Sequence, residues 1–328
     1  MLHIHNGDSA AGTAKKSDIP GEHLAWREAL VCGPTPGNLS IDKFCQLRAQ
    51  HLADAYGANL ERAERELRAQ EETLARLSDH EEVVLWFEHD LFGQVQLMYL
   101  LHRFAQSELG KTRLSLICIN EFPGVSGFRG FGELNEDQLA ELFPQRQEIT
   151  QPQLDLGSKA WQAYSAAQAA GLIALLDSDT SALPFLKGGI IKHLERFPST
   201  KNGLGRIESV GLELIAKGHS SFRSLFPAFA RREPEYGFGD AQLYLELKRL
   251  AEAPAPALSG GNNRTATDPA QMLLSSFEIT EFGKAVLAGE EDFVRRNGID
   301  HWLGGVHLVG SEAGWRWDEQ AQELLVSL

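Results

Sequence analysis

Two strand-like runs of this chain end in polar residues whose types could do chemistry. Leu2–His5 leads into Asn6–Ser9, and Val83–Phe87 leads into Glu88–Asp90. In a parallel α/β sheet, the loops that follow the strands gather at the carboxyl edge, where ligands normally bind. We therefore expect one crevice to collect four side chains, those of Asp8, Ser9, His89 and Asp90.

Further polar residues follow the same kind of strand end. Arg27, Glu28 and Glu121 do so, and Gln94 lies one helical turn beyond Asp90. Paired carboxylates beside an arginine can do general acid–base work, or they can form a buried ion-pair network, and both interpretations stay open. The catalytic candidates are Asp8, Asp90 and Glu121, and the ligand-binding candidates are Asn6, Gly7, Ser9, Arg27, Glu28, His89 and Gln94.

Gly7-Asp8-Ser9 looks like the nucleophile block of GDS-type serine hydrolases. Such a serine needs a base and a third group that orients the base. The GxND and DxxH segments that normally supply them are absent from the sequence, and Asp300-His301 has the wrong spacing. We favour the interpretation that Asp8 or Ser9 caps the next helix. An intermediate interpretation is that this helix start receives a phosphate or another anion.

Histidines suggest a second kind of chemistry. His3 and His5 lie on one face of a strand, and His89-Asp90 ends another strand, so zinc or manganese binding is conceivable. Packed or capping histidines are the more common outcome, and we predict no metal site. The cofactor stays open, because the sequence contains neither a GxGxxG nor a GxxxxGK[ST] motif.

Composition bounds the class of protein. The chain has 328 residues, of which 43% are hydrophobic and 23% charged, which is long enough for two domains with their own cores. A formal net charge of −14 argues against a general polyanion binder. Because Cys32, Cys45 and Cys118 form no CxxC pair, we expect reduced thiols rather than disulfides or structural zinc.

The apolar runs are short. The longest, such as Gly171–Leu176, fall well below the roughly 18–20 residues that span a bilayer. Residues 1–20 contain no apolar stretch of signal-peptide length. We expect a cytoplasmic protein with no membrane segment.

The first third of the chain alternates strand and helix patterns. Expected strands are Leu2–His5, His23–Trp26, Val83–Phe87 and Leu114–Ile119, and Arg48–Leu77 is predicted to be helical with Gly57 as a kink or break. This β-α-β rhythm implies a parallel sheet with right-handed crossovers. We therefore predict a Rossmann-like α/β domain over residues 1–130.

A helical connector is predicted over residues 131–200, with helices at Glu136–Phe143 and Ser158–Leu176. Three short helices then follow from residue 204. After them come a loop at Ala253–Ala270, a strand at Leu273–Ile279 and a helix from Thr280. Three helices followed by a strand pair is the winged-helix order, so residues 201–290 are predicted to form a winged-helix-like α+β domain.

The remaining residues, 291–328, are predicted to form a C-terminal β-hairpin segment. Trp302–Val309 and Trp315–Asp318 would be its two strands, with Gly304-Gly305 as a bulge. A strand pair alone is marginal in water, so this hairpin is expected to pack on another element.

These segments resemble a bacterial family known as domain of unknown function 1835. The resemblance rests on Leu2–Ser9, on Trp26–Glu28 with Gly33-Pro34, and on Leu85–Asp90 with Gln94. It continues in Asn297–Leu308 and Trp315–Asp318, so it spans nearly the whole chain. The family carries no assigned activity. Some members bear a sigma-factor-like label, which we attribute to the helix-turn-helix pattern around Ile207–Phe229.

The function expected from the sequence is binding of a small ligand, nucleotide-like or phosphorylated, at the carboxyl edge of the N-terminal sheet. A hydrolase or a transferase is the class of activity that fits such a site. The alternative is a transcriptional regulator that senses a ligand and binds DNA through the winged-helix-like domain. The third helix of that domain offers only Lys248 and Arg249 beside Asp240 and Glu246, and DNA-reading helices are usually more basic. DNA is therefore the less favoured partner.

Overall fold

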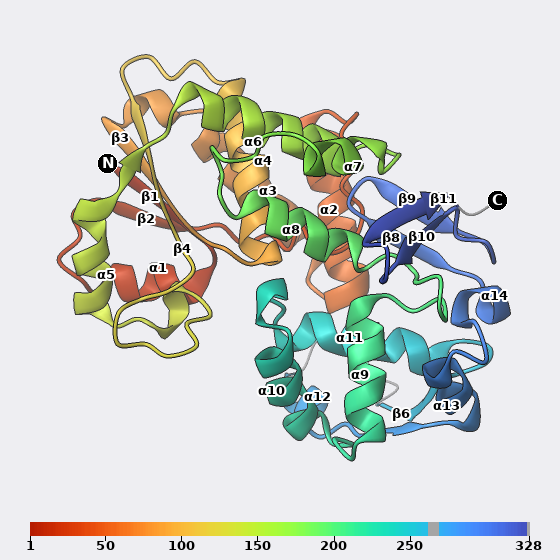
Figure 1. Cartoon of the computed structure of the whole chain (residues 1–328). Coiled ribbons are helices and arrows are strands. Elements are labelled where there is room, and N and C mark those ends of the chain that lie inside the picture. The colour runs from red at the N-terminus through yellow and green to blue at the C-terminus, as the bar shows by residue number, and fades with distance from the viewer. Residues whose placement is uncertain (262–268, 327–328) are drawn as a thin grey trace. The chain divides into compact units, whose positions relative to one another are not determined.

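The computed structural model describes residues 1–261 and 269–326, which form two compact units (Figure 1). Unit 1 contains Met1–Val31, Gly37–Cys45 and Glu64–Ile190. Unit 2 contains Cys32–Pro36, Gln46–Ala63 and Ile191–Leu328. Most of the expected helical connector, residues 131–200, therefore belongs to unit 1. In the described ranges, no helix is both long enough and apolar enough to cross a membrane.

Unit 1 is built on a five-stranded sheet in the order β2-β1-β3-β4-β5. The strands are β1 (Leu2–His5), β2 (Glu22–Ala25), β3 (Glu82–Glu88), β4 (Arg113–Ile119) and β5 (Gln147–Glu148). The first four are parallel, as predicted, and β5 pairs antiparallel with β4. From β1 the chain moves outward to β2 on one side, and it returns to β3 on the other side. The carboxyl ends of β1 and β3 are therefore neighbours.

Helices cover both faces of this sheet (Figure 1). Those that lie wholly or partly in unit 1 are α1 (Asp8–Ala14), α2 (Ile41–Tyr56), α3 (Leu60–Leu74), α4 (Leu91–Ala105), α5 (Glu136–Leu142), α6 (Gln151–Tyr164), α7 (Ala170–Leu176) and α8 (Leu186–Leu194). The predicted break at Gly57 is confirmed, because Gly57 has φ 64° and separates α2 from α3. Short 3₁₀ turns occur at Leu77–Asp79, Phe131–Glu133, Phe143–Gln145 and Pro234–Tyr236.

The prediction of one helix over Ser158–Leu176 is wrong. Helix α6 begins earlier and ends at Tyr164, and α7 begins at Ala170. The carbonyl of Ser165 accepts the backbone N–H of Gly37 at 2.9 Å. A contact with a distant segment thus occupies the carbonyl that the next helical turn would have used.

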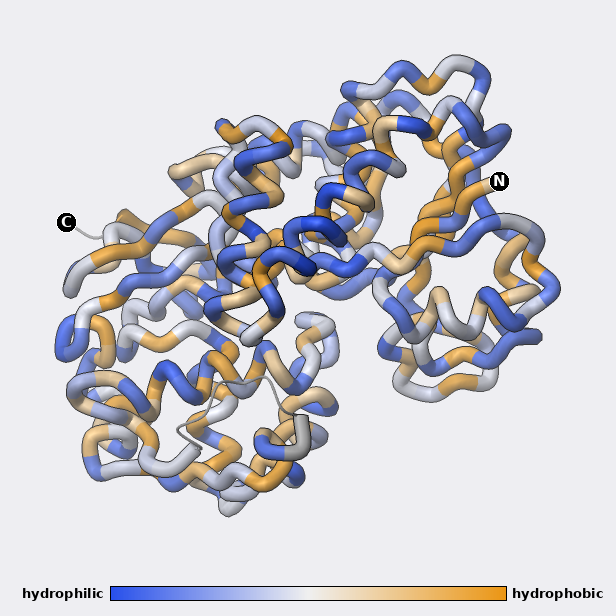
Figure 2. The backbone as a smooth tube through the Cα atoms, turned by 180° about the vertical axis from the view of Figure 1, so that it is seen from behind, coloured by the Kyte–Doolittle hydropathy of each residue, from blue (hydrophilic) through white to orange (hydrophobic). Residues whose placement is uncertain are grey.

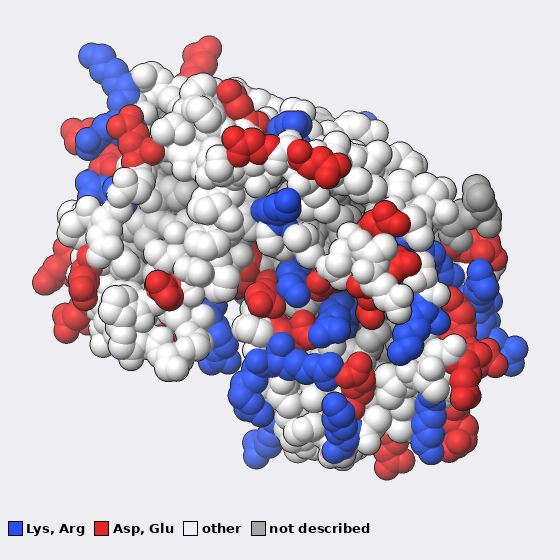
Figure 3. Space-filling view, in the orientation of Figure 1, with Lys and Arg blue, Asp and Glu red and all other residues white. Residues whose placement is uncertain are grey.

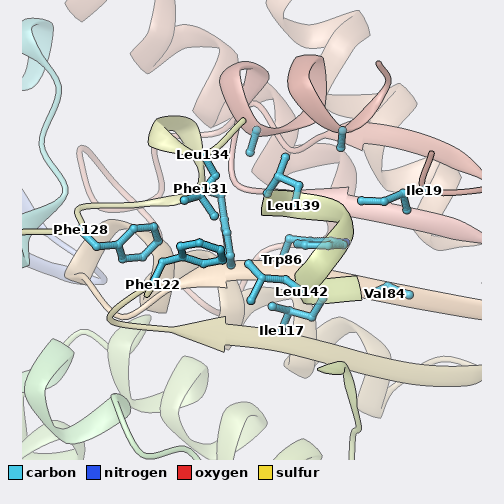
Figure 4. Close-up of a cluster of buried hydrophobic side chains, with 12 residues drawn as sticks. Ile19, Val84, Trp86, Ile117, Phe122, Phe128, Phe131, Leu134, Leu139 and Leu142 are labelled. Atoms are coloured by element: carbon cyan, nitrogen blue, oxygen red, sulfur yellow. The ribbon is translucent and has the colours of Figure 1, made fainter. Parts of the chain in front are cut away.

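The core of unit 1 forms around β3, whose seven residues are all buried. Figure 2 shows that the strands near the N-terminus are largely hydrophobic. On one face, Trp86 packs with Phe131 and with leucines of α5 (Figure 4). On the other side of the unit, α4 packs against α6, where a Cβ on Gly157 would lie 2.5 Å from Leu101. Only a glycine therefore permits this close helix contact.

Unit 2 contains a group of short helices and a small antiparallel pair of strands. The elements are α9 (Arg206–Ala216), α10 (Phe222–Arg232), α11 (Asp240–Glu252), β6 (Leu258–Gly260), α12 (Pro269–Leu273), β7 (Phe277–Ile279), α13 (Glu281–Ala288) and α14 (Phe293–Asn297). The three expected helices and the helix after Thr280 are confirmed. The predicted strand Leu273–Ile279 is too long, because it begins only at Phe277. Part of the predicted loop, residues 262–268, lies outside the described residues.

The C-terminal segment contains two hairpins, so the prediction of one is wrong. Strand β8 (Asp300–Leu303) pairs with β9 (Val306–Val309), and β10 (Trp315–Asp318) pairs with β11 (Glu323–Val326). Gly304-Gly305 is therefore a two-residue turn and not a bulge. Gly304 has φ 65°, which such turns require.

Candidate functional site

The carboxyl ends of β1 and β3 lead into loops that hydrogen-bond to each other. Gly7 directly follows β1 and has φ 93° and ψ −179°, a conformation essentially restricted to glycine. The amide of Asn6 donates from Nδ2 to Oε2 of Glu88 at 2.6 Å, and the backbone N–H of Asn6 donates to Trp86 O. The two loops thus share one polar centre, the carboxyl group of Glu88.

Glu88 is buried, with 5% of its surface exposed. Its second oxygen, Oε1, accepts the backbone N–H of Phe131 at 3.0 Å. A Cβ on Gly130 would lie 3.0 Å from this oxygen, so a glycine lets the loop after β4 approach it. One carboxyl group therefore connects the loops after β1, β3 and β4.

Asp90 is buried too and begins helix α4. Its Oδ1 accepts the backbone N–H of Gly93 at 2.7 Å, which makes Asp90 the N-cap of a 15-residue helix. A Cβ on Gly93 would lie 2.9 Å from the carbonyl oxygen of Glu88. The absence of a side chain at Gly93 therefore lets the first turn of α4 lie directly against the end of β3.

The two buried carboxyl groups influence each other's ionisation. Burial raises the pKa of Glu88 to about 7, although hydrogen bonds from Asn6 and Phe131 oppose the change. Burial and the charge of Glu88 raise the pKa of Asp90 to about 8. Two neighbouring carboxyl groups in a low-dielectric site do not both ionise readily. Near neutral pH the pair therefore holds a proton and can both donate and accept one.

The exposed part of this edge contains an ion pair. Arg27 donates from Nε to both oxygens of Asp8 at 2.9 Å and from Nη2 to Oδ1 at 2.7 Å. The hydrogen bond from Arg27 lowers the pKa of Asp8. Both side chains are more than half exposed, so the pair adds little stability. An incoming anion would compete with Asp8 for the donors of this guanidinium group.

The expectation that Asp8 or Ser9 caps helix α1 is wrong. Gly7 occupies the N-cap position, and no side chain caps this helix end. The reason is the extended turn at Gly7, which places Asp8 inside the first helical turn and directs its carboxylate to Arg27. The hydroxyl of Ser9 is exposed and lies 3.5 Å from the carbonyl oxygen of Gly132, which is not a base.

The remaining candidates lie at different depths. Gln94 is buried and donates to the carbonyl of Glu88 at 2.8 Å, so it holds the strand end from the far side. The backbone carbonyl of Glu28 accepts a hydrogen bond from the side-chain amide of Gln96. His89 is half-buried, and its ring packs edge-on near the ring of Phe185. Glu121 follows β4 and is exposed. The structure thus joins Asn6 with Glu88 and Asp8 with Arg27, and it leaves Glu121 apart from both pairs.

His3 and His5 pack on the sheet with His23. The rings of His3 and His23 stack at 4.6 Å, and His5 Nε2 lies 2.9 Å from His23 Nδ1. The indole of Trp86 donates to His3 Nδ1 at 3.1 Å. Burial lowers the pKa of His3 to about 4 and of His5 to about 2, so both rings are neutral. Across the described residues, no group of three or more His, Cys, Asp or Glu is arranged to hold a metal ion.

Glu88 was not among the sequence candidates, although it is the most connected residue of the site. It lies on the same strand face as Val84 and Trp86, by the two-residue alternation of a strand. Glu82 and Glu88 stand at the two ends of this face, with apolar residues between them. A carboxylate at the carboxyl end of a buried strand was the signal that could have identified Glu88.

No family model matches this chain, and no curated protein matches it. The resemblance to domain of unknown function 1835 stays a prediction.

Proposed function

We propose that unit 1 binds the pentose part of a nucleotide-like small molecule at the carboxyl ends of β1 and β3. We further propose that Asp90 and Glu88 exchange a proton with this ligand in a hydrolase or transferase reaction. The observation that supports the proposal is the buried carboxyl pair at this edge of a parallel sheet. Perturbed carboxyl groups cluster at functional sites, and the carboxyl edge of a doubly wound sheet is where such sheets bind their ligands. A carboxyl group at this edge can hydrogen-bond to the hydroxyls of a pentose.

The strand order supports the same interpretation. The order β2-β1-β3-β4 is found in doubly wound, Rossmann-like sheets of the flavodoxin type. In such sheets ligands bind where the chain reverses its direction across the sheet, which here is between β1 and β3. Both halves of the proposed site, Asn6–Ser9 and Glu88–Asp90, follow these two strands.

The charges favour a hydroxyl-bearing group over a phosphate. The edge contains the carboxyl groups of Asp8, Glu88 and Asp90, and the guanidinium of Arg27 is already paired with Asp8. The N-terminus of α4 is satisfied by the side chain of Asp90. A phosphate on the ligand would therefore compete with Asp8 for Arg27.

Ligand-observed NMR with methyl ribofuranoside, ribose 5-phosphate and inorganic phosphate tests this proposal on the full chain. We expect both pentoses to bind and the free phosphate to bind more weakly. Asp90→Asn should weaken pentose binding about tenfold, because leaving a buried hydrogen-bonding group without its partner costs about 1–3 kcal/mol.

Glu121→Gln is the matched control, since it removes an exposed carboxylate from the same edge of the sheet. Its pentose affinity should equal that of the wild type. Absence of any pentose signal, or equal losses in Asp90→Asn and Glu121→Gln, would contradict the proposal.

Unit 2 has features that support a winged-helix interpretation. Helices α9, α10 and α11 precede the antiparallel pair β6 and β7, and Ser221 between the first two helices bridges to Ser276 beside β7. The small third strand of a winged helix occupies this place between its first two helices.

A DNA-binding role for unit 2 has weaker support from its surface. Within α11, which stands at the position of a DNA-reading helix, Glu252 is the one exposed residue, and it is acidic. Figure 3 shows Lys and Arg side chains gathered over α9 and α10. The exposed basic residues there include Lys217, Arg223, Arg231 and Arg232. We expect weak, sequence-independent binding to duplex DNA. Tight selective binding in a gel shift, lost on Arg231→Glu with Arg232→Glu, would favour the regulator.

A further inference from the structure

We propose that unit 2 contains a second binding site, a cavity of about 260 Å³ that takes a neutral, planar nitrogen heterocycle of nucleobase size. This site is independent of the one proposed in unit 1, and none of its residues belongs to unit 1. Its walls come from the loop at Cys32–Pro34, the C-terminal part of α2, helix α11 and strand β8.

Helix α11 forms one wall with the face that a DNA-reading helix would turn to solvent. Gln242, Leu245 and Arg249 recur at helical spacing and line the cavity. Opposite them are His51 and Tyr56 of α2, and the Gln242 amide lies 3.5 Å from the Tyr56 hydroxyl. This face of α11 thus lines a partly open cavity.

The fixed charges around this cavity balance each other. Arg249 pairs with Glu208 and lies 3.4 Å from Glu246, and the buried Arg196 supplies the second positive charge. The charges of these two arginines and two glutamates compensate each other. The nearby His301 stays neutral, because burial lowers its pKa to about 4. The wall residue Asp300 adds a negative charge, but its side chain is 81% exposed, so solvent screens this charge. The cavity therefore suits a neutral ligand.

Two buried nitrogen atoms of wall residues have no hydrogen-bond partner among the residues that the structure describes. They are Nε2 of His51 and Nε of Arg249. The Arg249 nitrogen is a donor, whereas the neutral His51 ring either donates or accepts according to its tautomer. Unpartnered buried polar atoms are rare in native proteins and call for an explanation. Both atoms are fully buried behind the cavity surface, so a heterocycle with acceptors and donors on one edge would pair with them after a movement of these side chains.

Trp302 supplies an aromatic wall that is held in place. Its ring stacks on His307 with centroids 4.2 Å apart and planes 7° apart. A fixed indole is a suitable platform for a flat heteroaromatic ring. The volume of about 260 Å³ corresponds to roughly eight water molecules at ~30 Å³ each, which is room for a bicyclic base of about ten heavy atoms.

The test measures binding of adenine, hypoxanthine and cytosine to the full chain by saturation-transfer NMR and calorimetry. These probes lack a pentose, so they do not report on the site proposed in unit 1. We expect one of them to bind with a dissociation constant in the micromolar to millimolar range, as ligand efficiency allows for so few atoms.

Three variants locate the binding. Trp302→Leu should weaken it about tenfold or more, which is the effect of losing one stacking partner. Ala55→Phe, which fills the cavity from α2, should abolish it. Trp315→Leu is the matched control, because Trp315 is a tryptophan of the same unit that does not line the cavity, and binding should be unchanged. Thermal melting checks that each variant is folded. If Ala55→Phe does not fold, Trp302→Leu alone tests the proposal.

Two kinds of result would overturn the proposal. One is the absence of saturable binding for all three bases, or binding that Trp302→Leu leaves unchanged. The other is a preference for an ion such as glutamate or inorganic phosphate, lost on the same substitution, which would refute the neutral ligand class. Asp90→Asn should leave base binding unchanged whether or not the unit 1 proposal holds, so the two proposals fail separately.

Discussion

The substitution Asp90→Asn should change the unfolding free energy in a pH-dependent way. The unfolding free energy of the variant minus that of the wild type should be larger at pH 8 than at pH 5. Asparagine has nearly the same shape, and its side-chain oxygen can still accept the N–H of Gly93 at the start of α4. The substitution therefore keeps the helix cap. It removes the titrating group beside Glu88 and the negative charge that burial disfavours.

The magnitude follows from the shift in pKa. The pKa of Asp90 is raised from 3.8 to about 8, so between these values the folded protein binds more protons than the unfolded chain. Stability is then highest at low pH and falls as pH rises through this window. One pKa unit corresponds to about 1.4 kcal/mol, so the whole shift amounts to about 6 kcal/mol. Because Glu88 titrates together with Asp90, we assign about half of this free energy to Asp90. The expected change in stability between pH 5 and pH 8 is therefore ~3 kcal/mol.

The assay is urea unfolding followed by far-ultraviolet circular dichroism at pH 5 and pH 8. The quantity to compare is the unfolding free energy of Asp90→Asn minus that of the wild type, which should rise by about 3 kcal/mol from the lower to the higher pH. The control Glu121→Gln changes an exposed carboxylate, and its difference should stay within about 0.5 kcal/mol.

A difference that is the same at both pH values would refute the reasoning. It would mean that Asp90 is ionised in the folded protein throughout this range, as an ordinary helix cap is. The carboxyl pair would then hold no proton near neutrality, and the acid–base part of the proposed function would be wrong.

Three further outcomes are expected. Gly157→Ala should destabilise the protein by about 1–3 kcal/mol in thermal unfolding, because a Cβ there would lie 2.5 Å from a leucine of α4. Gly12→Ala, with nothing within 4 Å, should be neutral or slightly stabilising. Burial lowers the pKa of His5, so its contribution to stability is lost as pH falls below about 6.5. The wild type should then lose about 2 kcal/mol relative to His5→Gln between pH 7 and pH 5 in urea titrations. Arg316→Leu leaves the partly buried Asp292 without its 3.0 Å partner, and the melting temperature should fall as expected for a loss of about 3 kcal/mol.

Local patterns in the sequence were sufficient to predict the framework of unit 1. The run Val83–Phe87 predicts a strand buried on both faces, and all of β3 is buried. Residues that follow parallel strands must meet at one edge, so Asn6 and the Glu88–Asp90 loop could be placed together. These predictions depend on periodicity and chain direction, which are local properties.

Contacts between distant segments could not be predicted in this way. The role of Glu88 depends on Phe131, which is 43 residues away. The break after α6 depends on Gly37, and the pairing of Trp315–Asp318 depends on Glu323–Val326, a short strand whose apolar residues do not alternate with polar ones. The first two features depend on contacts with residues that are distant in the sequence. The third depends on a hydrophobic pattern that is too weak to predict a strand from one segment.

The way in which the chain alternates between its two units bears on the order of events during synthesis. Residues 32–36 and 46–63 leave the ribosome early, yet the rest of their unit begins only at Ile191. At roughly 5–20 residues per second, these segments wait on the order of ten seconds for their packing partners. During this time the half-apolar α2 has no completed core to enter. Neither unit can be cut out as one continuous piece, and a nascent chain stalled near residue 190 should be a good substrate for chaperones.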